Sequence, residues 1–235
     1  MGVEGFRIDR SVGDTVMKPA CPRYVTQYGN REYESITMPV ISRQTPAESH
    51  RHLQSEDVFA SLIDQHGYLA LQPAEDSFKR LVRSIVRQQV SMAAADAMCE
   101  QLFTRFDVNP TRMIEVDPAA LTEAGLSGAK AEYVNNVAHA FVQRGWSREY
   151  FQSKTDEEVI EELVQVTGIG PWTAKMYLQF GLGREDVFPV EDLGIRRAHE
   201  ELFGDETRAE MRSRATGWAP YRSIASLYLW RSTEK

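Results

Sequence analysis

The residue with the clearest potential for chemistry is Asp192, the second of two adjacent carboxylates within residues 187–197. An extended stretch containing Phe188 and Pro189 leads into this pair, and a helical pattern follows at residues 193–203. Asp192 is therefore expected at or near a helix N-cap, where an ordinary capping residue contributes about 1 kcal/mol to stability. The same position lets the helix dipole stabilise a charged carboxylate that points at a neighbouring cleft. The spacing alone leaves a plain cap and a catalytic carboxylate open.

A second candidate site precedes this aspartate at residues 162–175, which read ELVQVTGIGPWTAK. The pattern predicts a helix end, a Gly-x-Gly turn and a new helix with proline at its favourable first position. The glycines permit positive φ and leave backbone N–H groups uncovered, so a phosphate oxygen can approach the new helix. An ordinary turn between helices is the alternative, but the flanking residues favour a phosphate-binding hairpin. The candidate nucleic-acid contacts in this stretch are Thr167, Gly168, Gly170 and Lys175.

The elements that must position these residues are mostly helical. Residues 1–50 are rich in proline and show no helical period, although Gly29-Asn30 between residues 24–28 and 31–37 suits a short β-hairpin. From Ser55, a candidate helix cap, apolar residues recur at helical spacing. The clearest helix carries an apolar stripe from Phe78 to Val86.

Cap signals mark further helices along the chain. Ser91 and Ser127 are suited to begin helices that run to about residues 106 and 143, and Thr155 with Glu158 forms a capping box. Other helical stretches are expected at residues 171–182, 193–203, 206–216 and 221–232. The sequence predicts an all-α body over residues 51–235 after an N-terminal extension over residues 1–50.

The composition limits the classes of function. Among 235 residues the formal net charge is −7, which argues against a protein that coats nucleic acid by bulk basicity but permits local contacts with a few phosphates. Cys21 and Cys99 are too few for a disulfide framework or a four-cysteine metal or cluster site. No apolar run has membrane-spanning length, and the first residues lack a signal-peptide layout. We therefore expect a reduced intracellular protein without a membrane segment.

Together these stretches resemble the helix-hairpin-helix DNA glycosylases, most closely the 3-methyladenine DNA glycosylase II branch. The resemblance covers residues 76–235 and rests on separated motifs in the same order: residues 84–91 (SIVRQQVS), residues 125–127 with Lys130, the hairpin, Asp192, and residues 218–223 (WAPYRS) running on to Trp230. It implies two helical subdomains around a cleft, with the helix-hairpin-helix at its mouth.

The resemblance also assigns roles to residues. Asp192 becomes the catalytic aspartate, and Trp172 occupies the position of the nucleophilic lysine in bifunctional lyase relatives, so hydrolysis without strand cleavage is expected. No iron–sulfur cluster is expected. Trp172 is the leading candidate to stack on the damaged base in a pocket shared with Trp218, Tyr221 and Met176, where methionine replaces an aromatic residue of some relatives. Trp230 and Tyr228 are expected to pack in the core.

Two further groups follow from the resemblance. Gln89 lies where relatives place the residue that fills the gap left by the flipped nucleotide, and Gln88 is a candidate contact with the opposite strand. The main-chain carbonyls of Val164, Val166 and Ile169 are candidate ligands of a structural sodium or potassium ion.

Other polar residues leave open alternatives. Arg80, Arg83 and Arg87 recur on one helix face, which either reaches phosphates or is simply solvated. His199 is expected to cap or cover its helix, and Cys99 to lie in the core.

The expected function is a monofunctional DNA glycosylase of base excision repair. It would bind double-stranded DNA as a monomer, flip alkylated purines of the 3-methyladenine and 7-methylguanine type, and hydrolyse the N-glycosidic bond. A glycosylase for deaminated or oxidised bases and a non-catalytic DNA-binding module are the alternatives. The expected location is the cytoplasm with the nucleoid in a prokaryote, or the nucleus in a eukaryote.

Overall fold

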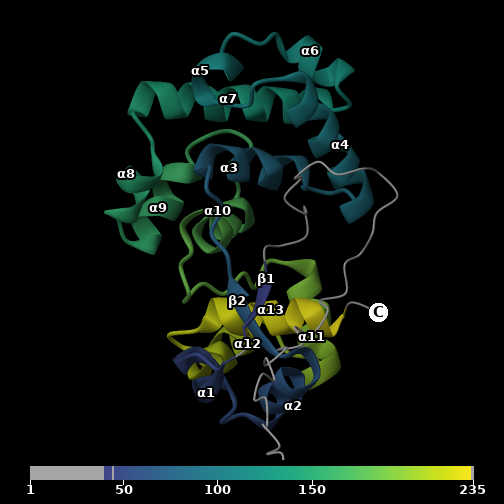
Figure 1. Cartoon of the computed structure of the whole chain (residues 1–235), viewed down its shortest axis with the longest axis vertical. Helices are drawn as coiled ribbons and strands as arrows, with labels where there is room; N and C mark the ends of the chain where they lie inside the picture. The colour runs from purple at the N-terminus through teal and green to yellow at the C-terminus, as the bar shows by residue number, and fades with distance from the viewer. Residues whose placement is uncertain (1–39, 44, 234–235) are drawn as a thin grey trace, which may run out of the picture. The chain divides into compact units, whose positions relative to one another are not determined.

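The structure is a computed structural model that describes residues 40–43 and 45–233 (Figure 1). These residues belong to one compact unit, Ser35–Lys235. The β-hairpin predicted at residues 24–37 and Cys21 lie outside the described residues. Within the described part of the chain, no helix combines the length and apolar composition needed to span a membrane.

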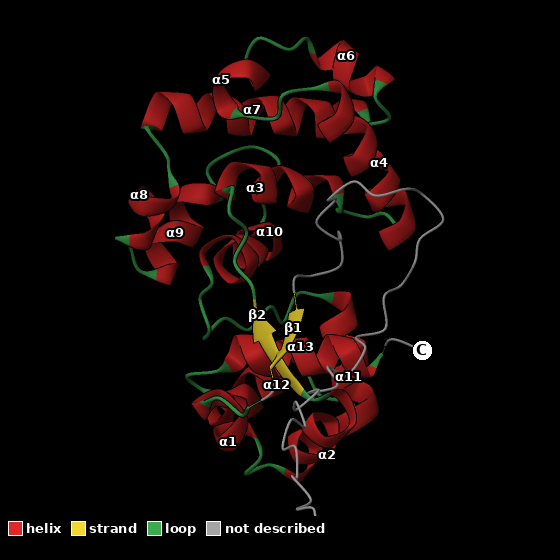
Figure 2. Cartoon of the chain, viewed as in Figure 1, coloured by secondary structure: helices red, strands yellow, loops and turns green. Residues whose placement is uncertain are grey.

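Helices make up most of the described chain, which confirms the all-α prediction (Figure 2). In chain order they are α1 (Glu48–Leu53), α2 (Asp57–His66), α3 (Ser77–Val86), α4 (Met92–Arg105), α5 (Pro110–Met113), α6 (Pro118–Glu123), α7 (Gly128–Arg144), α8 (Arg148–Gln152), α9 (Asp156–Leu163), α10 (Pro171–Tyr177), the π-helical η1 (Leu178–Leu182), α11 (Leu193–Phe203), α12 (Arg208–Arg214), the 3₁₀-helical η2 (Ala215–Trp218) and α13 (Arg222–Ser232).

Two short strands accompany the helices. β1 (Val40–Arg43) pairs antiparallel with β2 (Tyr68–Leu71), with Val40 opposite Leu71. The sequence analysis missed β2, because four residues are too few to show alternation. The Tyr228 hydroxyl donates to the Gly67 carbonyl and accepts from the Leu69 N–H, so α13 holds the start of this strand.

Most predicted caps are confirmed. The Ser91 and Ser127 hydroxyls accept from backbone N–H groups three residues on, and Thr155 forms its capping box with Glu158. The prediction for Ser55 is wrong: the N-cap of α2 is Glu56, and the Ser55 hydroxyl donates to the His52 carbonyl instead. The expected helix over residues 171–182 forms, but as α10 followed by the π-helix η1.

The described chain contains two hydrophobic clusters. The first includes side chains of α3, α4, α7 and α9, and the second includes side chains of α2, β2, α11 and α13. The continuous rod formed by α10 and η1 belongs to both, since Tyr177 lies in the first cluster while Met176 and Phe180 lie in the second. This arrangement confirms the predicted pair of helical subdomains and places the segment after the hairpin where they meet (Figure 1).

The turn between α9 and α10 has the conformation that the Gly-x-Gly pattern predicts. Gly168 has a φ of +104°, and a Cβ atom there would lie 2.2 Å from Cγ of Tyr133 on α7. Gly168 is thus required both for its backbone conformation and for close approach to α7. Gly170 is the N-cap of α10 with a φ of −95°, and a Cβ atom there would meet no atom within 4 Å.

This difference yields a stability prediction. We expect Gly168→Ala to lower the free energy of unfolding by about 2 kcal/mol or more, through backbone strain and steric overlap with Tyr133. Gly170→Ala is the matched control and should cost less, about 0.5–1 kcal/mol, because an N-cap favours glycine over alanine but no atom lies in the way of a Cβ atom. Urea unfolding followed by circular dichroism measures both variants, and equal stabilities would contradict the described turn.

Candidate active site

The site is centred on the carboxylate of Asp192, which is the N-cap of α11 as predicted. Its Oδ1 accepts the Ile195 N–H at 2.9 Å and the Trp230 indole N–H at 2.9 Å. Its Oδ2 accepts the Trp172 indole N–H at 2.7 Å. An ionised carboxylate offers about four lone-pair sites. Among the residues that the structure describes, three of these are used, and one site on Oδ2 is left for another partner.

The predicted neighbours Asp192 and Trp172 are therefore in direct contact. Trp172 is half-buried at the second position of α10, and its indole extends from the second hydrophobic cluster to the carboxylate. The hydrogen bond uses Nε1 at the edge of the indole ring, so it does not involve the aromatic face. Met176, one helical turn further on, is almost fully buried in the same cluster.

Trp230 packs against the second hydrophobic cluster and also reaches Asp192, a contact that the sequence did not predict. It was expected in the core, but it is only partly buried, and its N–H binds Asp192 from α13. Its ring lies 5.9 Å from that of Phe180 on η1. Residue type alone does not distinguish it from Trp218, which lies on a different element, the 3₁₀-helix η2.

Trp218 is enclosed in the second hydrophobic cluster. It is 2% exposed, its ring packs edge-on against Phe59 and Phe188, and its N–H donates to Glu56 at 2.6 Å. A ring enclosed in this way offers no face to a base, so its placement does not support the predicted pocket role.

Tyr221 also lies apart from the carboxylate. Its ring contacts that of His52 on α1. Tyr221 caps the N-terminus of α13, nine residues before Trp230. At 1.5 Å per residue this is about 13 Å along the helix, which separates Tyr221 from the Asp192 end.

The loop that leads into Asp192 is anchored by buried polar contacts. The Gln179 side chain donates to the Val187 carbonyl, and the Ser223 hydroxyl accepts the Val187 N–H. Asp186 accepts two hydrogen bonds from the Arg222 guanidinium, and these bonds outweigh burial and hold the pKa of Asp186 below its usual range. Contacts from both η1 and α13 therefore hold the loop that precedes Asp192.

Gln88 and Gln89 lie in the turn after α3. The Gln88 side chain donates to the Gly168 carbonyl and to the Thr173 hydroxyl, both at 2.9 Å, and so ties this turn to the hairpin. Both bonds use the Gln88 Nε2, so a contact with the opposite DNA strand that keeps them would have to use Oε1. Gln89 is exposed and has a φ of +56°, a conformation that non-glycine residues seldom adopt. Lys130 donates to the Val86 carbonyl and supports the end of α3.

Lys175 has a partner within the protein. Its ammonium donates to both oxygens of Glu191, at 2.9 and 3.1 Å, and to the Phe188 carbonyl. Burial would raise the pKa of Glu191, but the bonds from Lys175 and the backbone outweigh it and leave that pKa lowered. The predicted contact of Lys175 with DNA would have to compete with this pair.

Arg80 and Arg83 of α3 and its C-cap Arg87 fit neither sequence alternative fully. Arg80 is 5% exposed, and its guanidinium lies over the Phe180 ring at 4.7 Å. Burial lowers its pKa to about 9. Arg83 lies over the Phe103 ring, and burial lowers the pKa of Arg87, which the carboxylates of Asp96 and Asp192 act to raise.

The remaining predicted core residues are in place. Cys99 is buried, and burial raises the pKa of its thiol to about 11. His199, expected to cap or cover its helix, is instead 1% exposed on α11, where it packs on the Phe203 ring and its Nε2 lies 3.5 Å from Oε2 of Glu206.

The hairpin carbonyls are compatible with a monovalent cation. The Val166 carbonyl accepts the Ile169 N–H at 3.0 Å, and a carbonyl oxygen has a second lone pair with which to bind an ion. Val164 is the C-cap of α9, next to this turn. In the described residues there is no group of three or more His, Cys, Asp or Glu side chains arranged to hold a metal ion.

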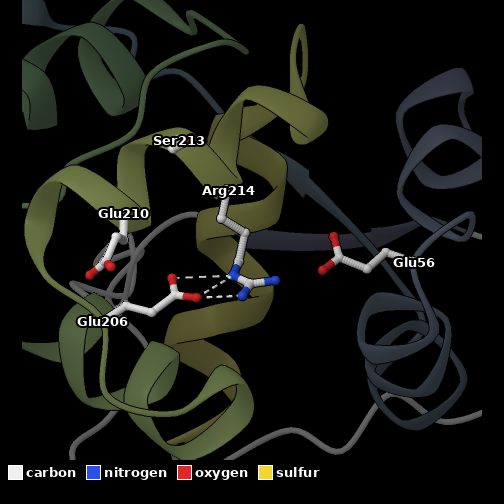
Figure 3. Close-up of a pocket in the computed structure, with 5 residues that line it drawn as sticks. All are labelled: Glu56, Glu206, Glu210, Ser213 and Arg214. Atoms are coloured by element: carbon white, nitrogen blue, oxygen red, sulfur yellow. Dashed lines mark hydrogen bonds and ion pairs between the residues drawn. The ribbon is translucent and has the colours of Figure 1, made fainter.

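A surface cavity of about 480 Å³ lies elsewhere, between α2 and α12 (Figure 3). Glu56, Glu206, Glu210, Ser213 and Arg214 line it, and Glu206 is paired with Arg214. It contains neither Asp192 nor a residue of the hairpin, so we do not assign the chemistry to it.

Fold and site together define a two-cluster helical protein in which a hairpin and a helix-capping carboxylate are linked through one tryptophan. The sequence model of the HhH-GPD superfamily of base excision DNA repair proteins matches residues 82–222, more than half of the chain. The chain belongs to this superfamily.

Similar proteins include a DNA-3-methyladenine glycosylase of Saccharomyces cerevisiae, 35% identical over 197 residues, which cover 67% of this chain and 67% of the relative. An alkylbase DNA glycosidase-like protein of Schizosaccharomyces pombe is 30% identical over 193 residues, with coverage of 77% and 91%. Among solved structures, the S. pombe 3-methyladenine DNA glycosylase in complex with abasic DNA matches with a TM-score of 0.75 and 26% identity, covering 80% of this chain and 97% of that one.

The corrected place of Trp218 yields a second prediction. We expect Trp218→Phe to lower the free energy of unfolding by about 2–4 kcal/mol, because it leaves a cavity and deprives Glu56 of its donor. In a double-mutant cycle with Glu56→Gln, the two losses should be less than additive, since both break one bond. Chemical denaturation measures the cycle. A Trp218→Phe protein as stable as the wild type would contradict the buried placement.

Proposed function

We propose that this protein is a monofunctional DNA glycosylase that removes alkylated purines, of the 3-methyladenine and 7-methylguanine type, from double-stranded DNA. The observation that carries the proposal is the contact between the Asp192 carboxylate and the Trp172 indole, next to a hairpin of the superfamily type. The names of the relatives support the same class of substrate.

The reaction makes modest demands on the protein. Alkylation of a ring nitrogen gives the base a positive charge, so it leaves readily and is attracted to an aromatic face. The face of Trp172 is the surface we assign to it. As the glycosidic bond breaks, positive charge develops on the sugar, and the remaining lone pair of Asp192 Oδ2 can stabilise that charge or orient the attacking water.

The hydrogen bonds to Asp192 prepare it for this role. Bonds donated by N–H groups stabilise a negative carboxylate and hold it in one orientation. Because the donors belong to α10, α11 and α13, no reorganisation of the carboxylate is needed when charge develops.

Access to the base requires that the nucleotide leave the duplex. We assign the filling of the resulting gap to Gln89, since its exposed side chain stands on a turn held in a strained conformation. The N–H groups of Gly168, Gly170 and the first turn of α10 would bind backbone phosphates, consistent with an acidic protein that needs few positive side chains. A sodium or potassium ion on the Val164, Val166 and Ile169 carbonyls would add positive charge beside the same phosphates.

Strand cleavage is not part of the proposed activity. It needs an amine that can form a Schiff base with the sugar. Trp172 stands where lyase relatives have that lysine, and the nearby ammonium of Lys175 is bound to Glu191.

The function is tested by the bases released from methylated, deaminated and oxidised DNA, identified by mass spectrometry. The wild type should release methylated purines, and Asp192→Asn should slow this release by at least about 100-fold while still binding abasic-site DNA. Glu191→Gln, the same change at the adjacent carboxylate, is the matched control and should lose far less. Release at the wild-type rate by Asp192→Asn would refute the catalytic assignment.

A further inference from the structure

Gly194 stands at the second position of α11, between Asp192 and Ile195. Glycine is one of the least favourable residues in a helix. Its backbone conformation gives no reason for it, since its φ lies outside the left-handed range that favours glycine. The absent side chain must therefore account for its presence.

Atoms of Trp230 and Asp192 lie close to the space that a side chain at position 194 would fill. A Cβ atom on Gly194 would lie 3.1 Å from Cδ1 and 3.4 Å from Nε1 of Trp230, and 3.1 Å from Oδ1 of Asp192. These atoms belong to the hydrogen bond between the Trp230 indole and the carboxylate. Gly194 is thus in contact with both partners of one bond.

Neither partner is free to move away. The Trp230 ring packs against Phe180, and the Asp192 carboxylate is also held by the Ile195 N–H and by Trp172. A contact of 3.1 Å between carbon atoms is shorter than the usual 3.5–4.0 Å, so one of the neighbours would have to shift by a few tenths of an ångström. A methyl group at position 194 would therefore act first on the Trp230–Asp192 bond.

We propose that Gly194 is a positioning residue, whose lack of a side chain lets Trp230 reach Asp192 and orient it. The expected effect on the rate of base release rests on the proposed function, whereas the expected effect on the Trp230–Asp192 hydrogen bond does not. The bond joins α13 to the N-terminus of α11. Position 194 therefore controls how α13, which is distant in sequence, orients the carboxylate.

The kinetic test compares Gly194→Ala with Gly128→Ala. Gly128 is also in the first turn of a helix, α7, and a Cβ atom there would meet no atom within 4 Å. Gly194→Ala should reduce the single-turnover rate of base release roughly tenfold, the effect of losing a hydrogen bond to a charged group, with unchanged binding of abasic-site DNA. Gly128→Ala should keep the wild-type rate.

A double-mutant cycle identifies the path of the effect. In a Trp230→Phe background the bond is already absent, so Gly194→Ala should cost little more. A full tenfold further loss in that background would show that the methyl group acts on Asp192 without Trp230, and would overturn the proposal. If Gly194→Ala alone does not fold, folding restored by Trp230→Phe supports the proposal, and continued failure to fold overturns it.

A spectroscopic test needs no activity. The chain has four tryptophans, so the indole N–H signals in a ¹H–¹⁵N spectrum can be assigned with single Trp→Phe variants. Gly194→Ala should shift the Trp230 signal upfield, as expected for a weakened bond to a carboxylate, and leave the Trp146 and Trp218 signals in place. An unmoved Trp230 signal would overturn the proposal. If no variant or wild type releases bases, the proposed function fails, but this spectrum still decides the role of Gly194.

Discussion

The orientation of one carboxylate, that of Asp192, is the constraint on which the rest of the structure depends. A helix cap alone would supply a single backbone donor from α11. Here two indole N–H groups complete the set, and they come from α10 and α13, which are far apart in the chain. The carboxylate is held in this way only if the three helices pack as described, so the fold and the site form together.

The continuous helix formed by α10 and η1 makes several of the contacts that position this carboxylate. It begins at the hairpin, presents Trp172 to Asp192, and continues into both hydrophobic clusters. Its π-helical part buries Gln179, which holds the loop before Asp192. It also brings Phe180 into contact with the Arg80 guanidinium and with the Trp230 ring. π-Helical turns are rare in proteins, and those that occur are often found at functional sites. Here the turn continues α10, so that one element links the hairpin to the carboxylate.

Local signals in the sequence predicted the helices, the hairpin turn and the capping position of Asp192, because caps and glycine turns depend on neighbours within a few residues. Contacts between distant segments were beyond such signals. The burial of Trp218 and the hydrogen bond from Trp230 to Asp192 depend on how distant segments pack, which residue type does not predict. The ion pair of Lys175 with Glu191 joins residues on different elements and could not be predicted either.

The central claim is that the open lone pair on Asp192 Oδ2 faces the sugar from which the base is released. The most direct measurement is a crystal structure of the full chain bound to duplex DNA that contains a stable abasic-site analogue. The account predicts Asp192 Oδ2 within about 3.5 Å of the anomeric carbon, with Trp172 and Trp230 still bound to the carboxylate. An abasic sugar placed away from Asp192, or a carboxylate that has turned from both indoles, would contradict it.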